Sequence, residues 1–377
     1  MKLRILIPLV TISILTFSCT DNKEMLTVIN ADGTCYREFT HTADSVFMNG
    51  DTAKNNPFPV DLDSGWKISW TYLTPEIHTN WPVKNWKWEK GDTTKNLIVT
   101  ARHNFTNAPE MGEKFRFRKS YEWHNVKTMS SLKKKFRWFY TYYTYKEVYP
   151  KIKTFDNVPF SAYMTSDEAS FWFTGKPDLL KGMNGVEIRE YIGDLENKYN
   201  SWFTHNLWNI EYKALLANYD LLDPKPVSKK RLEQARDSVF KKNMNFKENG
   251  EMELEMDKCL DNYYKTTAFS TFWNKKESPM KKFEDNLDSL EFIKYFTTSI
   301  DYKLLLPGKI IEPDNAVVHG DTLVWRLTAY RMVTSDYEIT AQSRKVNLWA
   351  FILSGLIVVI AIGSYFVKLR KPGFKHF

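Results

Sequence analysis

The sequence lacks the short motifs that mark common catalytic and cofactor-binding sites. It contains no Gly-x-Ser-x-Gly nucleophile elbow, no His-Glu-x-x-His zinc motif, no phosphate-binding loop and no Cys-x-x-Cys pair. Its histidines are scattered without the spacing of metal ligands, which favours core or surface imidazoles. We therefore predict a protein with no enzymatic activity, no metal and no other cofactor.

Excess charge is also scarce once the two ends of the chain are set aside. The formal net charge is +8, and these positive residues lie close to the termini: Lys2, Arg4, Lys368, Arg370, Lys371 and Lys375. The rest of the chain is only mildly basic, so a nucleic-acid partner has little support. Aromatic residues are abundant, with 13 Trp, 20 Tyr and 25 Phe, which argues for a folded core.

Cysteine is equally sparse, with 3 in the whole chain. If Cys19 carries a lipid, Cys35 and Cys259 remain to form a disulfide in an oxidising compartment. Alternatively, Cys259 is a core residue of a helix and has no partner.

The N-terminus has the layout of an export signal. Lys2 and Arg4 form a positive region, and the apolar run from Ile5 to Phe17 is too short to cross a membrane as a helix. A cleavage point follows at Ser18-Cys19. An uncut anchor and an ordinary signal peptide with an incidental cysteine are the alternatives.

Leu15-Thr16-Phe17-Ser18-Cys19 resembles the lipobox of bacterial lipoproteins, in the looser form found in Bacteroidota. The resemblance implies a signal peptide over residues 1–18. It also implies a tether over residues 19–24 that is lipidated at Cys19.

The C-terminus contains a membrane-spanning pattern. Trp349 to Val367 carries no charge and is long enough to cross a bilayer, and we predict a transmembrane helix over residues 346–367. The basic tail, residues 368–377, should stay in the cytoplasm. Residues 20–345 would then lie in the periplasm, attached to the inner membrane at both ends.

The part of the chain between these ends predicts an α+β fold. Strand and turn patterns predict a β-rich domain over residues 25–160, and helical periodicity predicts a helical insertion over 161–295. Strands return over 296–345. We expect one sheet formed from both ends of this ectodomain, with the helices inserted between its strands.

Individual elements can be placed by pattern. The turn Asn30-Ala31-Asp32-Gly33 predicts a hairpin, and alternation predicts a strand at Phe115 to Arg118. The run Phe136 to Tyr149 is rich in β-branched and aromatic residues, which predicts one long strand. A spacing near 3.5 residues predicts a long helix around Ile188 to Ile210, and Ser228 is placed to cap a second helix.

The closing segment, Lys303 to Val367, has a Pro-Gly strand, a Gly-Asp-Thr-Leu-Val-Trp hairpin and a last strand before the membrane helix. This order is similar to the LppM-type lipoprotein domain, and Thr27 to Thr42 extends the likeness. The resemblance implies a non-enzymatic role.

Six short motifs consist of Asp, then Ser or Thr, then a small or aliphatic residue. They resemble the O-glycosylation acceptor motif of exported Bacteroidota proteins, which implies these acceptors: Ser45, Thr52, Thr93, Ser238, Ser289 and Thr322. Gly-Asp-Thr is also good turn chemistry, and glycans fit at turns.

One aromatic and basic region is a candidate ligand face, with its residues as follows: Trp81, Trp86, Trp88, Lys114, Arg116 and Arg118. The rings could stack on sugars, and the cations could bind anionic lipid headgroups or acidic glycans. The alternative is a half-buried strand with a charged, solvated side.

Together these features predict a membrane-anchored periplasmic lipoprotein of the cell envelope with a binding or scaffolding role. Its partner would be an envelope protein, lipid or glycan. One alternative is a glycan-active enzyme that uses paired carboxylates. The other is a structural subunit of an inner-membrane complex, docked through Gly355 and Gly363.

Overall fold

The computed structural model of the chain describes residues 23–89, 91–152, 157–243, 255–287, 293–294, 296 and 298–370. Its strands are β1 Lys23–Ile29, β2 Cys35–Thr42, β3 Trp66–Tyr72, β4 Leu97–Phe105, β5 Met129–Arg137, β6 Tyr140–Tyr149, β7 Ser299–Leu305, β8 Lys309–Glu312, β9 Val317–His319, β10 Thr322–Thr328 and β11 Tyr337–Val346.

Most of the helices lie in the middle of the chain, two short ones lie in the N-terminal third, and the last one lies near the C-terminus. Their bounds are α2 Ser45–Met48, α3 Ala108–Lys114, α4 Ser166–Thr174, α5 Gly185–Ala217, α6 Lys229–Asn243, α7 Met256–Tyr264, α8 Ala268–Trp273, α9 Pro279–Asp285 and α11 Leu348–Arg370. Mixed helix and strand content of this kind confirms the predicted α+β class.

The larger sheet has the strand order β3-β4-β2-β1-β7-β10-β9. The predicted β1–β2 hairpin is confirmed: Gly33 has φ of +105°, and the backbone N–H of Thr34 donates to the Asp32 carboxylate at 2.9 Å. At the centre of the sheet, β1 from the start of the chain pairs in parallel with β7, placing Met25 opposite Tyr302.

A second sheet has the order β5-β6-β11-β8 and also combines strands from both ends of the ectodomain. The two sheets lie against each other, and their inward side chains share one hydrophobic core. The expectation of a single sheet was therefore wrong. Strands from the two ends do pair, but in two layers, because each sheet can bury its apolar face only against another element.

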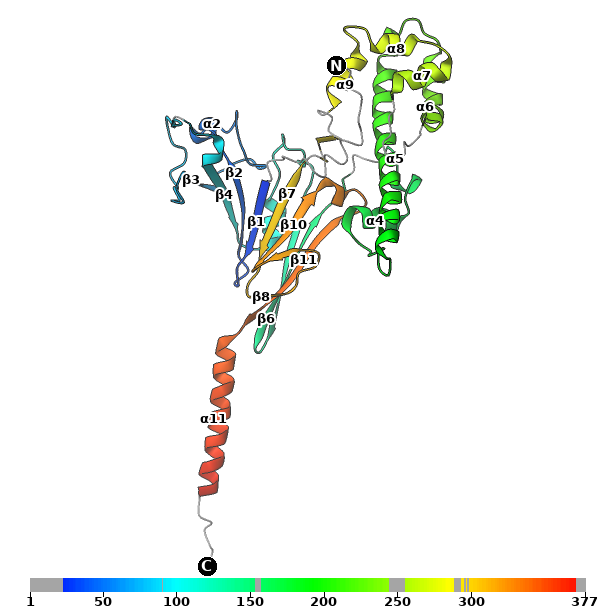
Figure 1. Cartoon of the computed structure of the whole chain (residues 1–377). Coiled ribbons are helices and arrows are strands. Elements are labelled where there is room, and N and C mark those ends of the chain that lie inside the picture. The colour runs from blue at the N-terminus through cyan, green and yellow to red at the C-terminus, as the bar shows by residue number, and fades with distance from the viewer. Residues whose placement is uncertain are drawn as a thin grey trace, which may run out of the picture.

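Helices α6–α9 form a separate unit at the end of one long connecting helix, α5. Helix α5 has 33 residues, so it extends about 50 Å. Its middle joins the core of the sheets through Tyr199, Trp202 and Phe203, and its C-terminal part packs with α6–α9 in a second core. This unit and α11 lie at opposite ends of the molecule (Figure 1).

Two strand predictions were wrong. Phe115 to Arg118 alternates between buried and exposed residues as expected, but it follows α3 as an extended segment without strand pairing. The segment predicted as one strand, Phe136 to Tyr149, is instead the end of β5, a turn at Trp138-Phe139, and β6.

Candidate functional site

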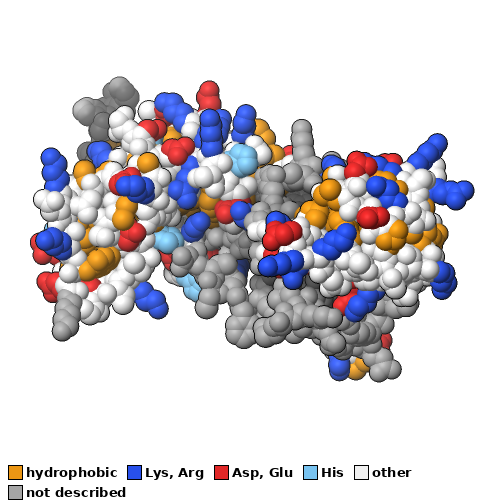
Figure 2. All heavy atoms as spheres, turned by 90° about the horizontal axis from the view of Figure 1, so that it is seen from above, with side chains coloured by type: hydrophobic (Ala, Val, Ile, Leu, Met, Phe, Trp, Pro, Cys, Tyr) orange, Lys and Arg blue, Asp and Glu red, His pale blue; other side chains and the backbone are white. Residues whose placement is uncertain are grey.

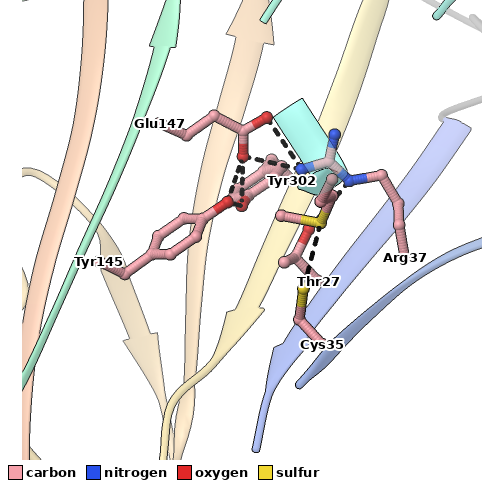
Figure 3. Close-up of polar contacts among 7 residues, drawn as sticks. Thr27, Cys35, Arg37, Tyr145, Glu147 and Tyr302 are labelled. Atoms are coloured by element: carbon pink, nitrogen blue, oxygen red, sulfur yellow. Dashed lines mark hydrogen bonds and ion pairs between the residues drawn. The ribbon is translucent and has the colours of Figure 1, made fainter. Parts of the chain in front are cut away.

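The most polar part of the interior lies between the two sheets. Arg37 extends from β2, and Glu147 extends from β6 toward it (Figure 3). The Nη2 atom of Arg37 donates to both carboxylate oxygens of Glu147 at 2.8 Å. Both side chains are 0% exposed, so this ion pair is entirely enclosed by protein.

Three neighbours complete the network. The hydroxyls of Tyr145 and Tyr302 donate to Oε2 of Glu147 at 2.7 and 2.8 Å, and Arg37 Nε donates to Thr27 Oγ1 at 3.2 Å. The guanidinium also lies 4.5 Å from the centre of the Phe115 ring. These side chains come from β1, β2, β6, β7 and the segment after α3, so the network ties both sheets together.

Electrostatics keep the Arg37 guanidinium charged and the hydroxyls of Tyr145 and Tyr302 protonated. Burial is the largest single effect and disfavours the charged guanidinium, but Glu147 together with the neighbouring tyrosines outweighs burial and raises the pKa of Arg37. Burial, reinforced by the Glu147 charge, also raises the pKa of Tyr145 and Tyr302 far above the usual tyrosine range. The tyrosines therefore remain hydrogen-bond donors to the carboxylate at all physiological pH values.

This arrangement suits a structural joint better than a catalytic site. The Glu147 carboxylate is occupied by three donors, and none of its surroundings is open to solvent. In the described ranges, no group of three or more His, Cys, Asp and Glu residues is placed to hold a metal ion.

The predicted tryptophan platform is partly buried packing. Trp81 stacks on Phe47 at 5.1 Å and donates from Nε1 to the Phe47 carbonyl at 3.1 Å. Trp86 lies edge-on against Tyr72 of the edge strand β3, at 5.0 Å, and Trp88 lies 6.2 Å from Tyr72. All three rings are half-buried, Trp81 against α2 and the other two against β3.

The predicted cations are engaged locally rather than gathered beside those rings. Lys114 forms an ion pair with Glu110 at 2.6 Å within α3. Arg116 donates to the carbonyls of Gly112 and Phe115, and Arg118 donates to the carbonyl of Asn56. In the described parts of the chain, none of these three cations lies over the ring of a tryptophan.

The structure does not bring the two ectodomain cysteines together. Cys35 and Cys259 are free and buried, the first in the core of the sheets and the second in the core of the helices. Cys35 Sγ instead lies 4.0 Å from Met111 Sδ. Burial raises the pKa of both thiols to about 11, so both are unreactive.

The glycosylation motifs occupy varied structures. Ser45 begins α2, Thr52 lies in a turn, Thr93 precedes a 3₁₀ turn and Thr322 begins β10, whereas Ser238 is exposed in the middle of α6. Ser289, like Cys19 and the signal peptide, lies outside the described residues.

Sequence reasoning missed the Arg37–Glu147 network. A signal was present in β6, where Tyr143, Tyr145, Glu147 and Tyr149 alternate along the inward face. An acidic residue within an apolar face implies a buried partner, because an unpaired buried charge is very costly.

Glu211, where α5 packs in the helical unit, is a second buried carboxyl, and its raised pKa predicts that the stability of this unit depends on pH. Burial, with repulsion from Glu284 and Asp257, raises the pKa of Glu211 from 4.5 to about 8. Between pH 4.5 and pH 8 the Glu211 carboxyl is ionised in the unfolded chain but stays protonated in the folded chain. The free energy of unfolding should therefore fall as the pH rises through this range and level off above pH 8.

Glu211→Gln should therefore remove this pH dependence and stabilise the helical unit above pH 8 by on the order of 3 kcal/mol. Thermal unfolding of the full chain in detergent, followed across this window, measures both effects. Glu233→Gln, at an exposed position on α6, is the matched control and should leave the slope unchanged. An unaltered slope in Glu211→Gln would contradict the assignment.

Comparisons of the chain with protein-family models, with curated proteins and with solved structures find no match in any of the three.

Proposed function

We propose that this chain is a periplasmic envelope protein anchored in the inner membrane by α11, with a non-enzymatic binding or scaffolding role. The two-sheet domain and the helical unit lie outside the membrane, and the C-terminal tail lies in the cytoplasm. A lipid on Cys19 provides the second anchor.

The observation that carries this proposal is the exposure of α11. Its segment Leu348–Phe366 has a mean hydropathy of 2.2, yet only 6% of it is buried in the protein. At 1.5 Å per residue these 19 residues extend about 28 Å, close to the thickness of a hydrocarbon core. An apolar surface of this size is stable when lipid covers it.

The shape of the ectodomain supports a binding or scaffolding role. Helix α5 carries the compact unit α6–α9 away from the end at which α11 leaves the sheets. At the end opposite α11, Lys and Arg side chains are mixed with Asp and Glu side chains. Hydrophobic side chains are visible among them on the helical unit (Figure 2). Such a mixed surface suits a protein partner better than a polyanion.

A two-anchor fractionation experiment tests the proposal. A chain ending at Asn347 and a full-length chain with Cys19→Ala should each remain in the membrane fraction, because each keeps one anchor. The combination, exported with an ordinary cleavable signal in place of residues 1–18, should be released as a soluble periplasmic protein. Retention of the combined variant, or release of the chain that ends at Asn347 alone, would contradict the two-anchor arrangement.

Orientation is tested in the same cells by cysteine labelling with a membrane-impermeant maleimide. Ser238→Cys, exposed on α6, should react in intact spheroplasts. His376→Cys, in the tail, should react after permeabilisation. The reverse pattern would overturn the proposed topology.

A further inference from the structure

The turn between β5 and β6 has unusual chemistry for an exposed turn. Trp138 and Phe139 form it, between the last residue of β5 and the first residue of β6. Phe136, Trp138 and Phe139 are 57%, 43% and 38% exposed. Exposed turns are usually polar, and neighbouring exposed aromatic rings indicate a surface that something covers.

The aromatic tip, defined as the side chains of Phe136, Trp138 and Phe139, packs against the first turn of α11, and the end of this hairpin lies beside the start of α11 in Figure 1. Phe136 stacks on Trp349 with an angle of 5° between the rings, and Trp138 meets the same indole edge-on at 5.3 Å. Phe139 lies 4.5 Å from Phe351. The tip and the beginning of the apolar helix therefore form one continuous aromatic surface.

Hydrogen bonds hold the tip at a defined height on α11. The side-chain amide of Asn347 donates to the carbonyls of Arg137 and Trp138 at 3.0 and 3.1 Å, and its backbone N–H donates to Phe139 at 2.9 Å. The indole Nε1 of Trp138 donates to Ser354 Oγ at 2.8 Å.

The bond to Ser354 places the Trp138 indole below the start of the span, while the carbonyls of residues 137–139 stay level with Asn347. Ser354 follows Leu348, the first residue of α11, by six positions, which corresponds to about 9 Å along the helix. A polar group at such a depth in a bilayer needs a partner within the protein, and Ser354 supplies one for the Trp138 indole. Tryptophan is also enriched at membrane interfaces.

Cations lie on the strand directly above the tip. Lys133, Lys135 and Arg137 alternate on one exposed face of β5. At about 3.3 Å per residue, Lys135 lies about 7 Å above Arg137 and Lys133 about 13 Å above it. A headgroup layer is roughly 5–8 Å thick, so with Arg137 at its inner boundary Lys135 lies in its outer part. Lys133 lies about 5 Å beyond the layer, from where its long side chain can reach down to the headgroups.

The side chains next to these three cations on β5 leave them available to bind a ligand. On the same face, Arg344 lies over the Tyr140 ring at 4.9 Å. Among the described residues, no acidic side chain forms an ion pair with Lys133, Lys135 or Arg137. On the opposite face, Lys134 donates to the carbonyl of Ala31 at 2.7 Å and braces the hairpin against the β1–β2 turn.

We propose that the tip of the β5–β6 hairpin inserts into the outer leaflet beside α11, and that Lys133, Lys135 and Arg137 bind anionic phospholipid headgroups above it. This inference rests on the proposed function, because it requires α11 to span the membrane. It adds a second, non-helical membrane contact made by the folded domain itself. The four-stranded sheet is then held at a fixed height and tilt relative to the bilayer.

Spin-label depth measurements on the full chain test the insertion. The chain is reconstituted in vesicles of phosphatidylethanolamine and phosphatidylglycerol with a label at one of three positions: Phe139→Cys in the tip, Ile357→Cys in α11, or Val317→Cys on the exposed strand β9. The parent chain, treated in parallel, measures any labelling of native cysteines. Collisions with oxygen and with a water-soluble nickel chelate then report depth.

The proposal expects positions 139 and 357 to collide often with oxygen and rarely with nickel, and position 317 to show the reverse. Nickel access at 139 with a lipid-embedded 357 would overturn the insertion and leave the proposed function intact. Rare collisions with both reagents at 139 would mean that protein covers the tip, which also overturns it. Nickel access at 357 would overturn the membrane-spanning role of α11 as well. Phe136→Cys repeats the measurement if the label at 139 disturbs the turn.

Lipid titration tests the cationic part. Lys133→Gln, Lys135→Gln and Arg137→Gln are combined in one variant of the full chain. Half-occupancy by phosphatidylglycerol, measured by native mass spectrometry in detergent, should need about tenfold more lipid than in the parent chain. The matched control, Lys229→Gln, Lys230→Gln and Arg231→Gln on α6, makes the same charge change and should leave the midpoint unchanged. Equal midpoints for the two triple variants would overturn headgroup binding at β5.

Discussion

Glu147→Gln is expected to destabilise the folded ectodomain by about 3–5 kcal/mol. The substitution keeps the size and shape of the side chain but removes the charge that neutralises Arg37. Because Arg37 is 0% exposed, its guanidinium would remain buried without a counterion. The hydroxyls of Tyr145 and Tyr302 would also lose their charged acceptor, and hydrogen bonds to charged groups are the stronger ones.

Chemical unfolding of the full chain in detergent measures this loss. Glu38→Gln is the matched control: Glu38 pairs with Arg102 at 2.6 Å, but Arg102 is 47% exposed, so the control should lose about 1 kcal/mol or less. Replacing both members of the buried pair, Arg37→Met with Glu147→Leu, should recover much of the stability because no unpaired charge remains. Equal losses for Glu147→Gln and Glu38→Gln would show that the buried pair has no special role.

Local patterns predicted the elements whose stability is mainly local. The Asn30-Ala31-Asp32-Gly33 turn sets the β1–β2 hairpin through its own side chains and a glycine with positive φ. Helix α5 is long and periodic, and its prediction from Ile188 to Ile210 was confirmed. Ser228 does precede α6, and its hydroxyl accepts from the Arg231 N–H at 3.4 Å.

Patterns failed where contacts distant in sequence decide the structure. The Trp138-Phe139 turn contains none of the residues that favour turns, and its position follows from contacts with α11 more than 200 residues later. Phe115 and Phe117 alternate with arginines because they fill the core, yet no strand pairs with them. An alternation of apolar and polar residues indicates which side chains are buried, but it does not show whether the backbone pairs with another strand.

The same limit applies to the candidate sites. Arg37 and Glu147 are 110 residues apart, so no local spacing could join them. The tryptophans of the predicted platform were recognised as a group, but their covering of Tyr72 and Phe47 depends on how the loop after β3 folds back. The number of cysteines likewise cannot show that Cys35 and Cys259 belong to different cores.

Gly308→Ala is expected to cost about 3 kcal/mol, through two effects that can be separated. Gly308 lies in the turn between β7 and β8 with φ of +81°, a conformation that costs an L-residue about 1 kcal/mol. An added Cβ would also lie 2.3 Å from the backbone carbonyl oxygen of Arg344, and overpacking of this kind typically costs about 1–3 kcal/mol.

Gly320→Ala separates these effects, because Gly320 also has positive φ, +61°, but no atom lies within 4 Å of its added Cβ. It should lose only about 1 kcal/mol in the same unfolding measurement. The difference between the two variants then measures how firmly the Pro307-Gly308 turn is pressed against β11, where Ser343 Oγ donates to the Pro307 carbonyl at 2.8 Å. Similar losses for both variants would mean that β11 shifts easily. Since β11 leads directly into α11, a firm contact at Gly308 also fixes where the sheet meets the apolar helix.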